Sequence, residues 1–304
     1  MPKILKRLPE GSRIAVIRLR SLGDCVLTTP ALALLKAHRP DLRIGVVVED
    51  RFRPVFEGNP DVDEILAAET SAITGWRPHL ALNFHGGTRS MWMTAASRAS
   101  IRAGFGHHAY SFLYNVKIPR AQEILGVERK VHTAEHLASA MFYLGVPRVE
   151  IPRAKLVAPE SGEALPAQYA VLHPFASAPE KAWPIDRFLA VARHLRDSAG
   201  LEPVVLAGPA DDAAGWGEFR VCRNAPLSEV KRVMAGAQLF VGNDSGPAHV
   251  AAAFGVPVVV LFGPSDPVTW APWRTEAQVL TAPRLEEIGV PAVIAAAESL
   301  RVRA

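Results

Sequence analysis

Residues 13–38, RIAVIRLRSLGDCVLTTPALALLKAH, contain the pattern on which the fold prediction depends. The run 13–19 is short and mostly apolar, as expected for a buried strand. A polar turn at Ser21–Asp24 then leads into a helix that we expect to end near His38. The same order of strand, turn and helix recurs along the chain. It predicts an α/β fold in which helices cover both faces of a parallel sheet.

The recurring pattern divides the chain into two halves. In the first half we expect strands and helices at 43–48, 51–57, 64–67, 79–84, 88–97 and 131–145. After the Pro- and Glu-containing stretch 152–167, we expect them at 169–173, 185–199, 203–207, 227–235, 238–242, 247–254 and 256–262. We therefore predict two Rossmann-like domains, residues 1–158 and 159–304, facing a central cleft. A terminal helix near 286–300 is expected to pack back on the first domain.

Length and composition exclude several classes of protein. The chain has 304 residues, 49% hydrophobic and 21% charged, which is ordinary for a folded protein and long enough for two domains. This composition excludes disordered and collagen-like proteins. A transmembrane protein is excluded because no apolar run approaches the roughly 20 residues that cross a bilayer. Cys25 and Cys222 are far apart and lack metal-binding spacing, and no secretory signal is evident. We expect a cytoplasmic protein.

Charge is distributed unevenly between the two halves. Residues 1–158 contain 22 Lys and Arg against 14 Asp and Glu, whereas residues 159–304 contain 12 against 16. The basic half suggests an anionic partner, such as an acidic substrate or an anionic membrane face, with chance as the alternative. Nucleic acid is not expected, because the basic residues form no dense stripe interleaved with aromatic residues.

Three segments at predicted strand ends carry the candidate chemistry, since open α/β sheets bind ligands beyond the carboxyl ends of their strands. The first is the turn Arg20–Asp24, where Gly23 permits a tight turn. Asp24 is a candidate catalytic carboxylate, and helix capping is the alternative explanation for it. No GxGxxG fingerprint occurs, so the sequence gives no support for NAD binding.

The other two segments lie in the second half. In the loop 173–184, Ser177 is a candidate hydrogen-bond donor and Lys181 a candidate diphosphate contact, a surface lysine being the alternative. The segment 240–249 starts a helix whose free N–H groups, from Ser245, Gly246 and the residues after Pro247, would bind a diphosphate. Asp244 would repel phosphate, so we expect it to accept hydrogen bonds from sugar hydroxyls, or to cap the helix.

Together these segments resemble bacterial glycosyltransferase family 9, the ADP-heptose:lipopolysaccharide heptosyltransferases, which have the GT-B fold. The resemblance spans about residues 13–270. It rests on RLRSLGDCVLTTPALALLK (18–36), NPDVDEIL (59–66), KAWPIDRF (181–188) and VGNDSGPAHVAAAFGVPVVVLFGPSDP (241–267), the last being the most specific. It implies an acceptor-binding first domain and a donor-binding second domain. It also implies inverting transfer from a nucleotide sugar, ADP-heptose, without a cofactor or a catalytic metal.

The resemblance also assigns roles to individual residues. It makes Asp24 the catalytic base, with an acceptor-binding turn formed by Arg20, Ser21 and Gly23. The implied donor-binding residues are Ser177, Lys181, Asp211, Asp212, Asp244, Ser245, Gly246 and His249. Asp211 and Asp212 are both candidates for the acid that contacts the ribose, and Phe175 stands where the family commonly has glycine. The implied acceptor is an anionic glycolipid, which would bring the protein into peripheral contact with the cytoplasmic face of the inner membrane.

Weaker motifs and alternative functions accompany this prediction. His132–His136 fits the HxxEH pattern of zinc proteases, and Asp61–Asp63 resembles a DxD metal–diphosphate motif, but chance and a turn explain them better. Trp270 and Trp273 could stack on a donor base, and His107 and His108 could contact an anionic acceptor. Alternative functions are transfer of another sugar, a sugar-nucleotide epimerase, and a sugar-nucleotide binding protein without transfer activity.

Overall fold

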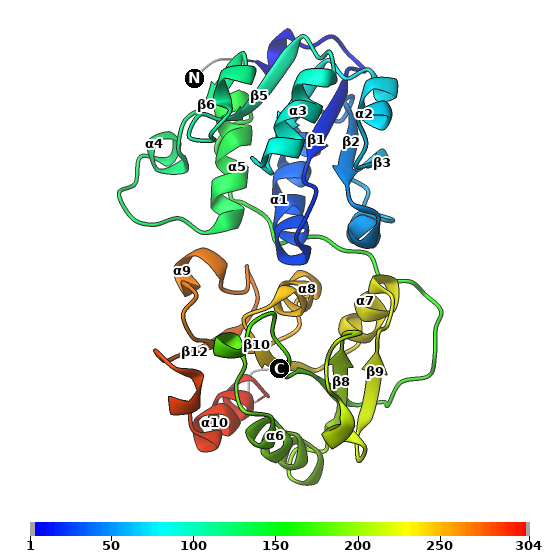
Figure 1. Cartoon of the computed structure of the whole chain (residues 1–304), viewed down its shortest axis with the longest axis vertical. Helices are drawn as coiled ribbons and strands as arrows, with labels where there is room; N and C mark the ends of the chain where they lie inside the picture. The colour runs from blue at the N-terminus through cyan, green and yellow to red at the C-terminus, as the bar shows by residue number, and fades with distance from the viewer. Residues whose placement is uncertain (1–3, 302–304) are drawn as a thin grey trace. The chain divides into compact units, whose positions relative to one another are not determined.

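The computed structural model describes residues 4–301. The chain forms two compact units, Met1–Val157 (unit 1) and Ala158–Ala304 (unit 2). Each unit is built on a six-stranded sheet in which all strand pairs are parallel (Figure 1). The two strand orders are β3-β2-β1-β4-β5-β6 and β12-β11-β10-β7-β8-β9. Numbered within its own unit, each sheet has the order 3-2-1-4-5-6 that is typical of Rossmann-type domains.

Unit 1 alternates strands and helices as its hydrophobic pattern predicts. Its strands are β1 (Arg13–Ile17), β2 (Arg43–Val48), β3 (Glu64–Ala67), β4 (Leu80–Asn83), β5 (Ile101–Phe105) and β6 (Val116–Ile118). Its helices are α1 (Leu22–His38), α2 (Thr70–Trp76), α3 (Thr88–Ala96), α4 (Ala121–Leu125) and α5 (Thr133–Leu144), with short 3₁₀ helices η1 (Leu5–Arg7), η2 (Asp50–Val55) and η3 (Ser111–Leu113). The central strands are almost wholly buried, because parallel sheets are covered on both faces.

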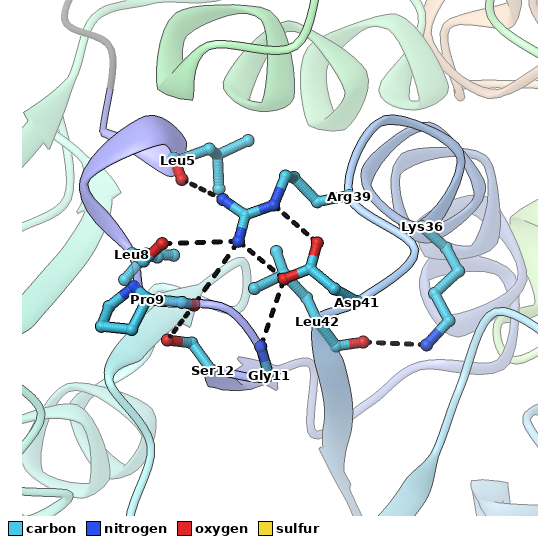
Figure 2. Close-up of polar contacts among 9 residues, drawn as sticks. All are labelled: Leu5, Leu8, Pro9, Gly11, Ser12, Lys36, Arg39, Asp41 and Leu42. Atoms are coloured by element: carbon cyan, nitrogen blue, oxygen red, sulfur yellow. Dashed lines mark hydrogen bonds and ion pairs between the residues drawn. The ribbon is translucent and has the colours of Figure 1, made fainter.

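The start of unit 1 is fastened to the end of α1 by one arginine (Figure 2). Arg39, the C-cap residue of α1, donates hydrogen bonds to the backbone carbonyls of Leu5, Leu8 and Pro9. It also pairs with Asp41, whose other carboxylate oxygen accepts from the Gly11 amide at 3.2 Å. The Arg39 hydrogen bond lowers the pKa of Asp41 to about 2. This cluster places the chain that leads into β1.

Unit 2 repeats the arrangement around its own core. Its strands are β7 (Tyr169–His173), β8 (Glu202–Ala207), β9 (Arg220–Arg223), β10 (Leu239–Asn243), β11 (Val258–Phe262) and β12 (Ala277–Thr281). Its helices are α6 (Ile185–Asp197), α7 (Leu227–Ala235), α8 (Gly246–Phe254), α9 (Pro267–Trp270) and α10 (Val290–Arg301), with 3₁₀ helices η4 (Pro179–Lys181), η5 (Ala214–Trp216) and η6 (Leu285–Glu287). Trp183 and Trp216 are fully buried in the core between the sheet and α6 and α10.

Several details differ from the sequence prediction. The expected helix at 51–57 is the 3₁₀ helix η2, and the elements β5, β6, β9, β12, α2, α4 and α9 were not predicted. The terminal helix α10 begins at Val290 and packs on α6 and on strands β10, β11 and β12 of its own unit. Among the described residues, no helix combines the length and apolar character needed to cross a membrane.

Candidate functional site

The strand order determines where each unit can bind a ligand. In unit 1 the order reverses between β1 and β4, and in unit 2 it reverses between β7 and β10. The two loops that leave the carboxyl ends of such neighbouring strands run to opposite faces of the sheet and leave a crevice between them. Asp24 follows β1, and Asp244 follows β10. The predicted site residues therefore lie where each sheet is expected to bind its ligand.

Asp24 occupies the first turn of α1. Ser21 is the N-cap residue of this helix, and Asp24 is the third residue after it. One Asp24 carboxylate oxygen accepts hydrogen bonds from the Ser21 amide, at 3.3 Å, and from the Ser21 hydroxyl, at 3.0 Å. The other oxygen pairs with the guanidinium of Arg18 at 3.1 Å. Capping thus explains the contacts of one carboxylate oxygen, and the ion pair explains the contact of the other.

Arg18 is an unusual residue to find at the end of a buried strand. Its exposed fraction is 6%, and its Nε atom is buried without a hydrogen-bond partner in the described structure. Burial lowers the pKa of the Arg18 guanidinium, and the charge of Asp24 acts in the opposite direction. Arginine stays protonated at neutral pH in any case. Asp24 is therefore the counter-charge that a buried cation requires.

A group of neutral imidazoles lies at the same end of the unit 1 sheet. His85 follows β4, His108 follows β5, and His136 stacks on Phe105 with ring centroids 3.9 Å apart. Burial lowers the pKa of His108 and of His136 to about 4, and Arg18 contributes to both shifts. Burial, with Arg18 second, also lowers the pKa of His85, whose Nδ1 is buried without a partner in the described chain. At neutral pH these rings carry no charge and can both donate and accept hydrogen bonds.

The rest of the predicted acceptor turn surrounds Asp24. Arg20 and Ser21 are exposed, whereas Gly23 is buried inside the turn. His107 is exposed and His108 is half-buried against Phe105, with a contact of 3.3 Å to the Tyr114 hydroxyl. The carboxyl end of the unit 1 sheet thus combines the Asp24 carboxylate with buried and exposed cationic groups and neutral rings.

In unit 2 the structure brings together side chains from β7, η4 and the start of α8. The ammonium of Lys181 lies 3.8 Å from the carboxylate of Asp244. The Ser245 hydroxyl lies 3.1 Å from Nδ1 of His173, the last residue of β7. Burial lowers the pKa of His173 to about 4, so this ring is neutral at neutral pH. Lys181 is 36% exposed and Asp244 14%, which leaves the cation accessible beside a more sheltered acid.

The start of α8 offers backbone donors to a ligand. Ser245 is its N-cap, and Gly246 and Pro247 open the helix. The Ala248 amide already donates to the Ser245 carbonyl at 3.2 Å, and Pro247 has no N–H. The amides of Ser245 and Gly246 have no acceptor within residues 4–301. A helix start with free amides beside a lysine is suited to bind an anion such as a diphosphate.

Asn243 fixes the loop that carries Lys181. Its side chain is fully buried and donates to the Pro174 carbonyl at 2.9 Å. The side-chain oxygen Oδ1 of Asn243 accepts a hydrogen bond from the Trp183 amide at 3.0 Å. These two bonds tie the end of β10 to both ends of the loop after β7. Lys181 is held near Asp244 for this reason.

The other predicted donor residues have different surroundings. Asp211 accepts a hydrogen bond from the Gly208 amide at 2.7 Å. Its charge raises the pKa of His173, against the larger effect of burial, so Asp211 lies near the ring that contacts Ser245. Asp212 is exposed and accepts from the Ala214 amide at 3.0 Å. Ser177 is exposed in the loop, and His249 is buried within α8. The structure therefore groups Lys181, Asp244, Ser245 and Asp211 more closely than the remaining candidates.

The weaker motifs have structural contacts of their own. His132 is the N-cap of α5 and accepts from the Ala134 amide, while Glu135 pairs with Arg129 at 2.6 Å. Asp61 pairs with Lys155, and Asp63 pairs with Lys36. Trp270 is in α9, and Trp273 lies against the Arg274 guanidinium. No cluster of three or more His, Cys, Asp or Glu side chains in residues 4–301 is arranged to hold a metal ion.

Four functional candidates were missed in the sequence. Arg18 is a charged residue inside an otherwise apolar strand pattern, and that interruption was the available signal. His85 and His173 stand directly at strand ends, where ligand-facing residues are expected. His136 was considered only as part of the HxxEH pattern, and its place beside Phe105 was missed because it depends on how α5 packs against β5.

Comparison with known proteins supports the same identification. The family model for glycosyltransferase family 9 (heptosyltransferase) matches residues 77–288. The chain is 28% identical to lipopolysaccharide heptosyltransferase 3 of Escherichia coli K12 over 293 residues, which cover 84% of this chain and 83% of that protein.

Solved structures show the same fold at lower identity. A family 9 glycosyltransferase from Veillonella parvula superposes with a TM-score of 0.85 at 24% identity, covering 96% of this chain and 98% of that one. The ADP-heptose lipopolysaccharide heptosyltransferase II of E. coli superposes with a TM-score of 0.80 at 22% identity, covering 96% and 99%. The expected GT-B fold is therefore confirmed. The chain belongs to glycosyltransferase family 9, the heptosyltransferase family, and is a glycosyltransferase.

Proposed function

We propose that this protein transfers a heptose from ADP-heptose to an acceptor of the lipopolysaccharide core type, with inversion and without a catalytic metal. Family membership and the names of its relatives support the sugar and the acceptor class. The observation that carries the mechanism is the position of the accessible Lys181 ammonium, 3.8 Å from Asp244 and so next to the free amides at the start of α8. This arrangement supplies positive charge for a diphosphate from the protein alone.

In this proposal unit 2 binds the donor. Lys181 and the amides of Ser245 and Gly246 contact the diphosphate and stabilise the charge that grows on it as the sugar leaves. Asp244 lies beside Lys181 and accepts hydrogen bonds from hydroxyls of the donor sugar. Asp211 or Asp212 contacts the ribose; Asp211 accepts a hydrogen bond from the Gly208 amide, just after the end of β8. Ser177 and His249 are further candidates on the same side.

Unit 1 binds the acceptor through the turn Arg20, Ser21 and Gly23. Asp24 accepts the proton of the acceptor hydroxyl as that oxygen attacks the anomeric carbon. The bond between the anomeric carbon and the diphosphate oxygen breaks in the same displacement, and ADP leaves with the bonding electrons. One displacement from the opposite side inverts the anomeric configuration. Arg18 fixes the position of Asp24 through the 3.1 Å ion pair.

A lipid-linked acceptor requires contact with a membrane surface. Three large aromatic side chains of unit 1 are exposed: Trp92 by 63%, Tyr110 by 40% and Phe112 by 70%. Trp92 belongs to α3, which packs against η3, the element that contains Phe112. Aromatic side chains favour the interface between lipid and water. We propose that this aromatic surface makes the peripheral membrane contact, and Trp92→Ser with Phe112→Ser should reduce sedimentation with anionic vesicles.

Thermal-shift screening with ADP-, UDP- and GDP-sugars tests the donor. A ligand that binds the native state raises the melting temperature by mass action, and we expect the largest rise with ADP-sugars. Stabilisation by UDP- or GDP-sugars alone would contradict the proposal. A transfer assay with excess EDTA tests metal independence, and NMR of the product's anomeric proton tests inversion. A time course with donor but no acceptor separates transfer from epimerisation, which alone would convert the free donor.

A further inference from the structure

Five arginines of unit 1 lie near the amino ends of its strands, at the opposite end of the sheet from Asp24. Arg13 and Arg43 begin β1 and β2, Arg77 and Arg98 stand three residues before β4 and β5, and Arg102 is the second residue of β5. Within residues 4–301, none of these five arginines pairs with an acid. Like charges that gather without counter-charges favour an anionic ligand.

Two of the five arginines line a pocket of about 850 Å³. The pocket lies at the C-terminal ends of α2 and α3, before β4 and β5. Its lining includes Thr74, Arg77, His79, Ser97, Arg98 and Ser100. Arg13 and Arg102 donate to backbone carbonyls nearby, and Arg43 lies over the Trp76 ring. The guanidinium groups of Arg77 and Arg98, in contrast, have no partner among the described residues and remain available to a ligand.

The backbone of both pocket arginines is left-handed. Arg77 has φ 51° and Arg98 has φ 56°, a region in which glycine is the favoured residue and a long side chain is strained. Arg77 is the C-cap residue of α2, a position that commonly holds glycine. Stability alone would therefore favour glycine at both positions. A strained residue that lines a cavity suggests a binding role for its side chain.

The lining hydroxyls indicate what else the ligand carries. The hydroxyls of Thr74 and Ser100 donate to backbone carbonyls, so each keeps lone pairs that can accept from a ligand in the pocket. The Glu69 carboxylate accepts a hydrogen bond at 3.3 Å from the hydroxyl of Ser71, which lines the pocket. A bare anion would gain little from these acceptors. A ligand that combines an anionic group with hydroxyl donors would satisfy both the arginines and the acceptors.

We infer that this pocket is a second binding site, separate from the transfer site, for a phosphorylated saccharide. The phosphate contacts Arg77 and Arg98, and the sugar hydroxyls donate to the lining oxygens. The pocket volume exceeds that of a phosphate group and suits a small saccharide. The inference does not depend on the proposed donor, acceptor or metal independence of the reaction, because no residue of the transfer site lines the pocket.

The test measures binding of glucose 6-phosphate to the whole protein by NMR, with saturating ADP present to occupy the donor site. The ring protons of His79, which lines the pocket, report on occupancy. We expect their shifts to saturate with glucose 6-phosphate at lower concentration than with glucose or inorganic phosphate. The double variant Arg77→Gly/Arg98→Gly should weaken binding by about a hundredfold or more, because it removes two charge-assisted hydrogen bonds to the phosphate.

The same variant distinguishes a binding role from a structural one. Glycine adopts a left-handed backbone without strain, so the melting temperature of the double variant should be unchanged or higher than that of the parent protein. Weaker binding by this variant therefore cannot be attributed to unfolding. Arg274→Gly, at φ 55° in unit 2, is the matched control for loss of charge and should bind like the parent protein. Binding that the double variant retains in full, or an absence of His79 shifts, would overturn the proposal. Equal affinity for inorganic phosphate would overturn the assignment to a saccharide.

Discussion

The substitution Asp24→Asn separates the catalytic role of this carboxylate from its structural role. Asparagine retains one side-chain oxygen and replaces the other with an amide that only donates. It can therefore accept from Ser21 or from Arg18, but not from both, and Arg18 loses its counter-charge in either case. Capping alone predicts almost no loss of stability, because asparagine caps helices about as well as aspartate. The structure changes that expectation, since Ser21 is the cap and Asp24 pairs with a buried cation.

The size of the stability effect follows from burial. Removing one partner of a fully buried ion pair costs about 3–5 kcal/mol. The Asp24 side chain is 24% exposed, so water compensates for part of the loss, and we expect the free energy of unfolding to fall by about 1–3 kcal/mol. A shift of about 2–4 °C in melting temperature per kcal/mol is usual for a domain of this size. The transfer rate should fall by about 10²–10⁴-fold, the scale for losing a general base.

The assay combines thermal unfolding with single-turnover transfer at saturating donor. Asp41→Asn is the matched control, because it removes the carboxylate partner of another arginine, Arg39, outside the transfer site. It should lower the melting temperature and leave the rate of transfer unchanged. If Asp24→Asn lowers the melting temperature but transfers sugar at nearly the parent rate, then Asp24 serves only as the counter-charge of Arg18 and the proposed mechanism is wrong.

The remaining predictions concern the donor site, the buried histidines and the N-terminal cluster. Lys181→Met should weaken ADP binding and slow transfer together by about tenfold or more, measured by titration and single turnover, because the charge acts on the diphosphate in both states; Arg193→Met, outside the site, is the control. The pKa values of His136 and His173 are about 4 in the folded protein, below the ordinary 6.5, so the unfolded chain takes up protons first and the melting temperature should fall from about pH 6.5 towards pH 4. A flat profile over that range would refute their burial as neutral rings. Asp41→Asn should lower the melting temperature by a few degrees without changing transfer, and an effect on rate would contradict its purely structural role.

The architecture was predictable because a buried strand is marked by a short run of apolar residues, which is a local feature of the sequence. The runs 43–48 and 169–173 are short and apolar, and both are strands at the predicted residues. The edge strand β9 (Arg220–Arg223) was missed because none of its residues is fully buried and its sequence, RVCR, carries little apolar signal. Edge strands and short helices depend on pairing with neighbours already in place, which no local pattern records.

The site was only partly predictable, because its residues act through partners distant in the sequence. The turn Ser21–Asp24 and the start of α8 were found from strand ends and helix starts, which are local signals. The contact of Ser245 with His173 spans 72 residues, and it follows only once β7 and β10 are known to be neighbours. The left-handed arginines Arg77 and Arg98 gave no signal at all, because glycine and asparagine mark such positions in a sequence and arginine does not. A residue that contradicts its local backbone preference is visible only in a structure, and at Arg77 and Arg98 the left-handed backbone supports the proposed binding role because both side chains also line one pocket.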